Sequence, residues 1–208
     1  MFSRRHFMTS SLLGAGGMAL PTLLRAQDAT VDPAIADTPI EPPARDMSPK
    51  IVRLDNPLPP GEIHVVPDVY SLYWTLPNGE AMRYYVGVGR DALYISGIFN
   101  VGAKKEWPSW TPTPDMIERE PEHYAQYKDG MPGGPENPLG ARALYLFQPQ
   151  VGDTFLRIHG TDKPETIRTD VSNGCARLVN DQVIDLYDRV PLGTAVYLYE
   201  KNLLPKAT

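Results

Sequence analysis

Short segments rich in β-branched and aromatic residues, separated by turn signals, begin at Gly61. EIHVV at 62–66 and VYSLYWTL at 69–76 come first, and Pro77-Asn78-Gly79-Glu80 joins the second to AMRYYVGVG. An Asn-Gly pair between two such segments is the strongest short-range signal for a β-hairpin. Later segments of the same kind are ALYLF at 143–147, DTFLRIHG at 153–160 and AVYLY at 195–199. The chain is therefore predicted to be mostly β, starting with a meander.

Helical patterns are few. NDQVIDLYDRV at 180–190 has apolar residues at helical spacing (Val183, Ile184, Tyr187 and Val190), and Asn180 is predicted as its N-cap. The stretch 114–127 has room for one short helix, interrupted at Pro121. We predict a β sandwich or barrel with one or two short helices.

A composition change near Gly61 divides the chain. At 208 residues it is long enough for one core. Residues 27–60 are crowded with proline and lack apolar periodicity, so we expect an extended tether, of which 48–54 docks as an edge strand. Residues 61–200 form the predicted domain, and 201–208 a C-terminal tail.

The first 26 residues have the pattern of an export signal of the twin-arginine type. Arg4 and Arg5 precede a short apolar segment rich in glycine, and Ala26 supplies a small residue for cleavage. The alternative is a retained membrane anchor, but the apolar run is shorter than about 20 residues and contains Pro21. We expect cleavage after export and a location in the periplasm.

The net charge of the chain disfavours some classes of binding partner. Loss of residues 1–26 leaves 17 basic residues against 25 acidic ones, a net charge of −8. Such a surface repels nucleic acid and anionic lipid, so neither is expected as a general partner.

Cys175 is the only cysteine of the chain. In an oxidising compartment structural cysteines normally come in pairs, and a single one forms no internal disulfide. An unpaired thiol there needs either burial, as free cysteines commonly have, or a chemical use. From composition alone, both explanations stay open.

A nucleophilic cysteine needs a base, donors for an oxyanion and a backbone that exposes the sulfur. A turn through Ser172, Asn173, Gly174 and Cys175 offers successive N–H groups, and Gly174 keeps that backbone open. His159 ends a predicted strand sixteen residues before Cys175, which makes it the candidate base. His64 and His123 are expected to be ordinary surface or half-buried residues.

The middle segment from Lys105 to Phe147, which ends with the predicted strand ALYLF, is rich in proline and glycine. Long loops of this kind are commonly lids or binding surfaces. Four large side chains are candidates to line a groove there, or else belong to the core (Trp107, Trp110, Tyr124 and Met131).

The motifs IHGT at 158–161 and SNGCARL at 172–178, followed by an amphipathic helix, resemble the active-site signature of the L,D-transpeptidases, the YkuD or ErfK-type family. YYVGVGR, AKKEWPSWTPTPDMI and PGGPENPLGARALYLF look like further family segments. The resemblance spans roughly residues 61–200 and implies the β-rich fold of that family. It also favours the nucleophile over a buried structural thiol.

The resemblance implies an enzyme, without cofactor or metal, that cross-links peptidoglycan stem peptides. Cys175 attacks the third stem residue, usually meso-diaminopimelate, expels D-Ala, and passes the acyl group to an amine of a second stem, giving a 3→3 link. Carbapenem-type inhibitors are expected to acylate the same thiol.

Residue roles implied by the resemblance follow the two motifs. His159 is the base, oriented by the carbonyl of Gly160 or Thr161. Backbone N–H groups of the turn hold the oxyanion, Ser172 stabilises the turn, and the candidates for the oxyanion site are Asn173, Gly174 and Cys175. Arg177 binds a stem carboxylate, or else forms an ion pair with Asp170 or Asp181.

One position departs from the family pattern, because Asn173 stands where most members have a second histidine. That change is expected to affect the reaction rate and the preference for the acceptor.

Alternatives to the transpeptidase function remain. The chain could be an L,D-carboxypeptidase or endopeptidase of the same family, could attach an outer-membrane protein to peptidoglycan, or could be a non-catalytic wall-binding module. A metal site is a further alternative, but the spacing of its candidate ligands is not typical of metal ligands (His159, Cys175, Asp162 and Asp170).

Overall fold

The computed structural model of the chain describes residues 46–90 and 92–203. The predicted export signal, most of the tether and most of the C-terminal tail lie outside the described residues. The prediction of a mostly β protein is confirmed: the described elements are dominated by strands, with three short α-helices.

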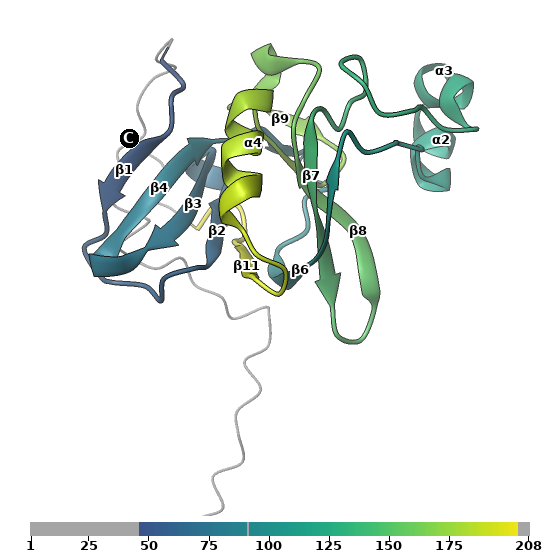
Figure 1. The fold of residues 1–208 in the computed structure, drawn as a ribbon. Coiled ribbons are helices and arrows are strands. Elements are labelled where there is room, and N and C mark those ends of the chain that lie inside the picture. Colours follow the sequence, from purple (N-terminus) through teal and green to yellow (C-terminus); the bar gives the residue numbers. More distant parts are fainter. Residues whose placement is uncertain (1–45, 91, 204–208) are drawn as a thin grey trace, which may run out of the picture.

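A mixed nine-stranded sheet organises the fold, in the order β1-β4-β3-β2-β11-β6-β7-β8-β10. Its strands are β1 (Lys50–Arg53), β2 (Ile63–Val66), β3 (Ser71–Leu76), β4 (Glu80–Tyr85), β6 (Gly97–Glu106), β7 (Arg142–Gln148), β8 (Gly152–His159), β10 (Ala176–Arg177) and β11 (Ala195–Leu198). Two further strands, β5 (Val88–Gly89) and β9 (Asp170–Ser172), pair in parallel beside it. Figure 1 shows this arrangement.

The hairpin predicted at the Asn-Gly pair is the β3–β4 hairpin, in which Leu76 lies opposite Glu80. Asn78 and Gly79 both have positive φ, 65° and 72°. Glycine and asparagine are the residues that tolerate this left-handed conformation most readily. The turn therefore has the chemistry that its sequence indicates.

The predicted edge strand is also present. β1 pairs antiparallel with β4 and ends the sheet, so this part of the proline-rich region docks on the domain. Leu54, the residue after the strand, is buried in a small apolar cluster with Val66, Val69 and Tyr73.

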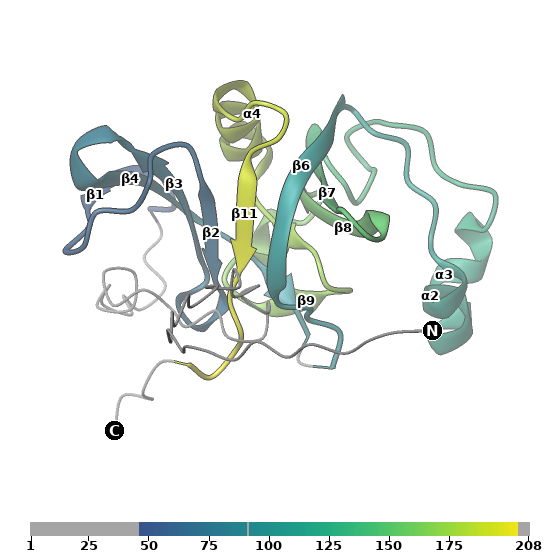
Figure 2. The same ribbon diagram turned by 90° about the horizontal axis from the view of Figure 1, so that it is seen from below.

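Helix α4 (Asn180–Arg189) packs between the two arms of the bent sheet, as Figure 2 shows. Its buried side chains include Val183 and Leu186, and Val190 directly after the helix is buried with them. These residues join the main apolar core, which β2, β3, β6, β7 and β8 line from the sheet. Burial of each such side chain stabilises the fold by about 1.5–3 kcal/mol.

The N-cap prediction for Asn180 is wrong. Val179 is the N-cap of α4 and makes no side-chain capping bond, while Asn180 is the first helical residue. Its side chain makes tertiary hydrogen bonds instead, which are described with the site below.

The predicted interruption at Pro121 divides the 114–127 stretch into two helices, α2 (Pro114–Arg119) and α3 (Pro121–Tyr124). Thr113 caps α2, because its hydroxyl accepts a hydrogen bond from the Met116 backbone N–H at 3.2 Å. Figure 1 shows both helices at the β7–β8 side of the molecule, away from α4.

Strand β6, with ten residues, is the longest strand and was not predicted. Glycines at both its start and its middle, Gly97 and Gly102, hide the alternating pattern that marks a strand. The register of β6 against β7 shifts between Val101 and Ala103, so Gly102 occupies an irregularity of the ladder. Phe147 of β7 lies over this glycine, where an added Cβ would come within 2.4 Å of its ring.

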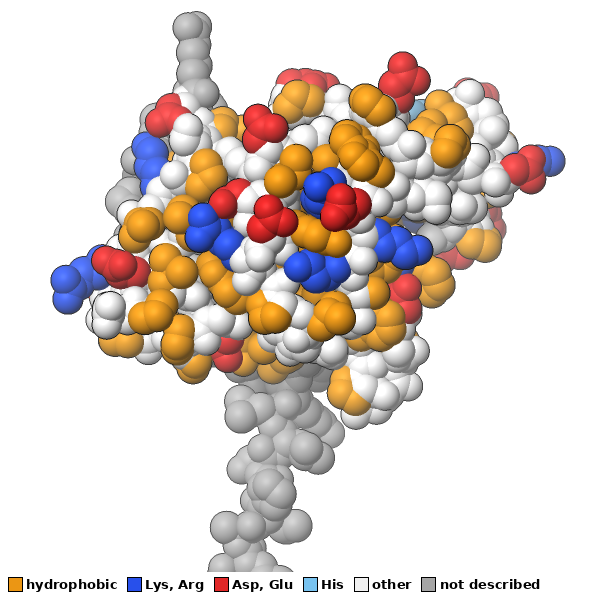
Figure 3. Space-filling model, in the orientation of Figure 1, with side chains coloured by type: hydrophobic (Ala, Val, Ile, Leu, Met, Phe, Trp, Pro, Cys, Tyr) orange, Lys and Arg blue, Asp and Glu red, His pale blue; other side chains and the backbone are white. Residues whose placement is uncertain are grey.

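The face over α4 has acidic and basic side chains interspersed with apolar ones (Figure 3). Two of the ion pairs in this region join Arg189 to Asp185 at 2.7 Å and Arg142 to Glu106 at 3.1 Å. Positive and negative side chains are therefore mixed on this face, which has no large patch of one charge among its described residues. In the part of the chain that the structure describes, no helix is both long and apolar enough to cross a membrane.

Candidate active site

Parallel pairing of β8 with β10 brings the two predicted catalytic motifs side by side. Ala176 lies opposite Ile158, and Arg177 lies opposite His159. Continuing this register by one residue sets Cys175, which directly precedes β10, beside Arg157. Alternate residues of a strand point to the same face, so this register sets Cys175 on the same face of the sheet as His159, two residues further along. The pairing of β8 with β10 thus brings the two motifs to one part of the sheet.

His159 is buried, with 3% of its surface exposed. Its Nδ1 lies 2.6 Å from the carbonyl oxygen of Gly160, the nearer of the two carbonyls that the sequence suggested. A carbonyl only accepts, so Nδ1 carries the proton and Nε2 has the free lone pair. Burial, then the positive charge of Arg177, lowers the pKa of His159 to about 3. The imidazole is therefore neutral at pH 7.

Cys175 is half-buried and has no disulfide partner. Burial raises the pKa of its thiol. A backbone hydrogen bond from Arg157 and the guanidinium charges of Arg157 and Arg177 act in the opposite direction. Burial therefore favours the uncharged forms of both groups, a thiol and a neutral imidazole, over a thiolate and an imidazolium.

The turn before Cys175 is held in one shape. The Ser172 hydroxyl donates to the carbonyl oxygen of Cys175 at 2.5 Å. Gly174 has φ +110°, and a Cβ there would lie 2.9 Å from the Leu93 carbonyl oxygen, so only glycine fits. Among the described residues, no acceptor is found for the backbone N–H groups of Asn173, Gly174 or Cys175. These three N–H groups are the candidates for an oxyanion site.

Asn180, the first residue of α4, connects this helix by hydrogen bonds to the segments that contain Ala141 and Thr161, close in sequence to His159. Its Oδ1 accepts hydrogen bonds from the backbone N–H groups of Ala141, at 2.9 Å, and Thr161, at 3.3 Å. Gly160 packs directly against this oxygen, where an added Cβ would come within 2.2 Å. Asn180 therefore positions the loop whose carbonyl orients the imidazole of His159. Sequence analysis missed this role because an asparagine before an apolar repeat is also the pattern of an N-cap.

Replacing Asn180 with alanine is expected to reduce the free energy of unfolding by about 1–3 kcal/mol, because two buried backbone N–H groups lose their acceptor. Urea unfolding followed by tryptophan fluorescence measures the change. Asn180→Asp keeps an oxygen at this place and is the matched control, with a smaller expected loss. Equal unfolding midpoints for the wild-type protein and Asn180→Ala would contradict the role.

Arg177 lies across the backbone of Gly87. The two residues exchange both backbone hydrogen bonds at 2.9 Å, and a Cβ on Gly87 would lie 3.0 Å from the Arg177 side chain. The guanidinium Nη1 lies 3.4 Å from the hydroxyl of Thr166, while its Nε is buried without a hydrogen-bond partner. Glycine at position 87 therefore makes room for the Arg177 side chain.

The ion pairs found within residues 46–90 and 92–203 do not include Arg177. Asp170, one of the two acids that the sequence suggested as its partner, pairs with Lys201 at 2.9 Å. Among the described residues, Arg177 thus forms no ion pair with Asp170 or Asp181. Burial lowers the pKa of its guanidinium, and the charge of Asp162 is among those that act in the opposite direction.

Arg157 is a site residue that sequence analysis missed. Its guanidinium makes two hydrogen bonds to Asp153, at 2.6 and 2.9 Å, and lies 3.9 Å from the centre of the Tyr145 ring. Its charge acts on both Cys175 and His159. The only sequence signal was its position two residues before the histidine on the same predicted strand.

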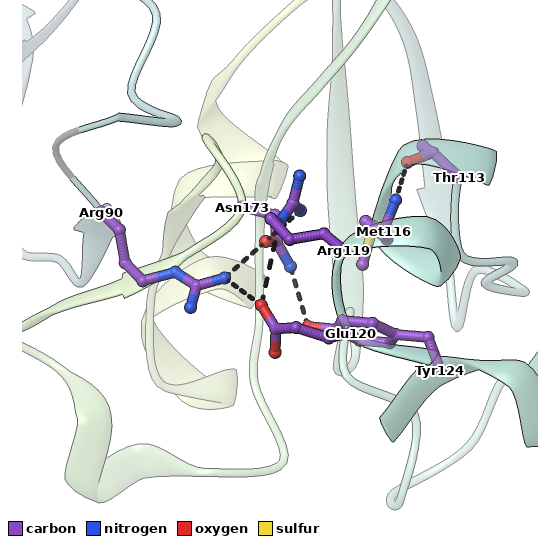
Figure 4. A network of polar contacts seen from close by, with 7 residues as sticks. All are labelled: Arg90, Thr113, Met116, Arg119, Glu120, Tyr124 and Asn173. Carbon is purple, nitrogen blue, oxygen red and sulfur yellow. Dashed lines mark hydrogen bonds and ion pairs between the residues drawn. The ribbon is translucent and has the colours of Figure 1, made fainter. Parts of the chain in front are cut away.

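Asn173 joins the turn to the α2–α3 segment, as Figure 4 shows. Its Oδ1 accepts from Arg90 at 3.0 Å and from Arg119 at 2.8 Å, and its Nδ2 donates to the Tyr124 hydroxyl at 2.9 Å. Arg90 also pairs with Glu120 at 2.6 Å. The side chain of Asn173 thus binds a neighbouring segment, which leaves its backbone N–H for an oxyanion.

The remaining sequence candidates lie elsewhere. The expectation of a surface or half-buried His64 is wrong: this histidine is buried in β2, stacked on Tyr197 with ring centroids 4.7 Å apart, and its Nδ1 lies 3.1 Å from the Tyr199 hydroxyl. His123 is exposed and packs edge-on against Tyr124 at 4.5 Å. Neither belongs to the pair at Cys175.

Of the four candidates to line a groove, Trp110 contacts both Tyr124 and Met131. Trp110 packs against Tyr124 at 6.1 Å between centroids and pairs with Met131 through a backbone bridge, while Trp107 is 45% exposed. They are surface or half-buried residues rather than core. Among the described residues, no group of three or more His, Cys, Asp or Glu side chains is placed to hold a metal ion.

The comparison with protein families matches residues 60–198 to the YkuD L,D-transpeptidase catalytic domain. One relative is the protein of Fuscovulum blasticum that is named as an L,D-transpeptidase in the ATP synthase subunits region, ORF 5. It is 33% identical over 93% of this chain and 96% of its own length. ErfK/SrfK of Escherichia coli K12 is 32% identical over 62% of this chain and 41% of its own length. YqjB of Bacillus subtilis is 33% identical over 71% and 77%.

Solved structures agree on the fold. A Brucella melitensis crystal structure, described as a carnitine operon oxidoreductase, is 48% identical over 74% of this chain and 93% of that chain, with a TM-score of 0.50. That description applies to the Brucella protein. An Enterococcus faecium L,D-transpeptidase mutant is 17% identical over 68% of this chain and 50% of its own, with a TM-score of 0.50. Together with the matched domain, these relatives show that the chain belongs to the L,D-transpeptidase (YkuD) family.

Proposed function

We propose that this protein is an exported peptidoglycan L,D-transpeptidase that forms 3→3 cross-links through a thioester on Cys175. The observation that carries the proposal is the β8–β10 register, which sets Cys175 and His159 on one face of the sheet. The candidate oxyanion N–H groups of the turn before Cys175 and the family membership support it.

The first half-reaction forms the acyl-enzyme. The Cys175 sulfur attacks the carbonyl carbon of the third stem residue while its proton moves to Nε2 of His159, the nitrogen left free by the bond to Gly160. The carbonyl oxygen becomes an oxyanion, which the N–H groups of the turn stabilise by about 3–4 kcal/mol for each well-aimed donor. Collapse breaks the peptide bond, and the imidazolium gives its proton to the departing D-Ala amine.

The second half-reaction consumes the thioester. An amine of a second stem peptide attacks the same carbonyl carbon and loses a proton to His159. The carbon–sulfur bond then breaks, and the sulfur recovers a proton from the imidazolium. The product is a peptide bond between two third residues, and the enzyme returns to its starting state without a cofactor.

Two guanidinium groups shape the electrostatics of this cycle. Arg157 and Arg177 both disfavour the imidazolium and favour negative charge on sulfur. We therefore expect the imidazolium of His159 and the negative charge on the Cys175 sulfur to form only during attack, when the thiol loses its proton. Both are neutralised again when the adduct collapses. We propose that Arg157 serves in this way, held in place by its two bonds to Asp153.

Arg177 is proposed to bind a carboxylate of the donor stem, because the ion pairs found among the described residues do not include it. Arg177→Ala should weaken donor binding by about 1.5–3 kcal/mol, the value of a hydrogen bond to a charged group. Equilibrium binding of a donor tetrapeptide to the Cys175→Ala protein measures it. Arg177→Lys keeps the charge but not the planar fork, so an intermediate loss is expected. Unchanged affinity in Arg177→Ala would leave it a structural residue.

Peptidoglycan fragments incubated with the protein and weighed by mass spectrometry test the proposal. Dimers joined 3→3 are the expected product. Tripeptides trimmed of D-Ala would instead show that water replaces the amine, as in a carboxypeptidase. A stem linked to an outer-membrane protein would show that an exported protein supplies the acceptor amine.

Fragments that stay unchanged, together with an unmodified Cys175, would favour a non-catalytic wall-binding module. The proposed location is the periplasm, where this substrate is found. Fractionation of cells, with Arg4 and Arg5 replaced by lysine in a matched strain, tests the twin-arginine route: accumulation of the variant in the cytoplasm is the expected result.

A further inference from the structure

Asn173 holds residues from three separate segments at once. Arg90 follows β5, Arg119 ends α2, and Tyr124 ends α3, and each makes a hydrogen bond of 2.8–3.0 Å to the same amide (Figure 4). The orientation of that amide is decided by its partners. A guanidinium only donates, so Oδ1 must face the two arginines, and Nδ2 then donates to the Tyr124 oxygen.

This bond places the Tyr124 hydroxyl over the nucleophile turn. Asn173 and Arg177 flank Cys175, each two residues away, and the hydroxyl contacts the first and lies within electrostatic range of the second. The Tyr124 ring is supported from behind by Trp110, at 6.1 Å between centroids. Because its oxygen already accepts from Asn173, the proton of the hydroxyl is available for an acceptor.

We infer that Tyr124 is a specificity-determining residue of the donor site, held by Asn173 so that its hydroxyl and Arg177 together bind a carboxylate of the stem peptide. The inference rests on the proposed function for the identity of the ligand. It adds a residue from the α2–α3 segment to a site whose other members come from β8, β10 and the turn between β9 and β10.

A carboxylate fits this place because the Tyr124 hydroxyl and the Arg177 guanidinium can both donate to it; Asp162 is the acid whose charge also acts on Arg177. An ionised carboxylate only accepts, and it binds best to a guanidinium fork with additional O–H or N–H donors. The acid of the network, Glu120, is already paired with Arg90, at 2.6 Å, and lies 3.7 Å from Arg119. One carboxylate balances only one of these two guanidinium groups, so the network keeps a net positive charge near Tyr124, to which the charge of Arg177 adds.

Tyr124→Phe tests the hydroxyl alone, because the ring and its packing stay. Donor tetrapeptides are compared with matched peptides in which one free carboxyl at a time is amidated, and KM and kcat are measured by release of D-Ala. The expected result is that KM of the carboxylate peptide rises about tenfold, while one amidated peptide, already weak with the wild-type enzyme, does not change further.

Tyr127→Phe is the matched control. Its ring also packs on Trp110, at 5.9 Å, but it lies outside the network of Figure 4, so wild-type constants are expected. An equal effect of Tyr124→Phe on all peptides, or on kcat alone, would overturn the carboxylate assignment. A wild-type protein that releases no D-Ala would instead refute the proposed function.

The positioning role of Asn173 has a readout that needs no activity. Hydrogen exchange of residues 114–127, followed by mass spectrometry, is expected to be about tenfold faster in Asn173→Ala, because the segment loses its two hydrogen bonds to Asn173, from Arg119 and to Tyr124. Asn173→Asp keeps the oxygen that the two arginines bind and should exchange more slowly than the alanine variant. Exchange at the wild-type rate in Asn173→Ala would overturn the positioning role, whatever the enzyme assays show.

Discussion

Replacing Cys175 with alanine is expected to abolish covalent labelling by a carbapenem. The wild-type protein should gain the mass of one inhibitor molecule, because the thiol attacks the β-lactam carbonyl as it attacks a stem peptide. Cys175 is the only thiol of the chain, so no other cysteine can replace it in the variant. Intact-mass spectrometry after equal incubation of both proteins measures the difference, which is all or none.

Two controls make this result interpretable. Thermal unfolding of Cys175→Ala should match the wild-type protein within a few degrees, because the side chain is half-buried and loses only its sulfur. A labelled Cys175→Ala protein would locate the nucleophile elsewhere. A wild-type protein that stays unlabelled would remove the main support for an enzyme and favour the wall-binding module.

His159→Ala is expected to slow acylation by about 10²–10⁴-fold, the usual contribution of a positioned general base. The pH profile is the sharper readout. The imidazole pKa of about 3 keeps the base form present at every pH above that value, so the wild-type rate should show no acid limb near pH 6.5. Without the base, the rate should follow the thiolate fraction and rise about tenfold per pH unit below the thiol pKa.

The same group predicts a change in stability with pH. The unfolded chain binds a proton at His159 near pH 6.5, whereas the folded chain does so only near pH 3. The contribution of the neutral, buried ring to the free energy of unfolding is therefore present above pH 6.5 and is lost as the pH falls from 6.5 towards 3. His159→Ala should lose that part of the pH dependence.

An acylation rate equal to the wild type in His159→Ala would show that another base acts.

Much of the fold could be predicted because its signals are local. The β3–β4 hairpin depends on Asn78 and Gly79, whose backbone angles few other residues adopt, and α4 has an apolar repeat of helical period. β6 could not be predicted, since two glycines interrupt its pattern and its pairing with β7 and β11 supplies the missing stability.

The candidate site divides in the same way. Cys175 and His159 could be proposed from the chain, because the solitary thiol and a histidine at a predicted strand end both lie in motifs that resemble the L,D-transpeptidase signature. The role of Asn180 and the contact of Tyr124 with Asn173 could not, although Tyr124 was among the candidates to line a groove. Their side chains act on segments 39 and 49 residues away in sequence, at Ala141 and Asn173, and no local pattern records such contacts.

The sequence by itself determined most of the strands, the turn chemistry and the candidate reactive groups, since these depend on neighbours within a few residues. The tertiary structure alone decided that Cys175 and His159 share a face, that Nε2 is the free nitrogen, and that the Asn173 amide reaches α2 and α3. Those properties depend on strand register and long-range packing, where a shift of one residue would turn the thiol to the opposite face.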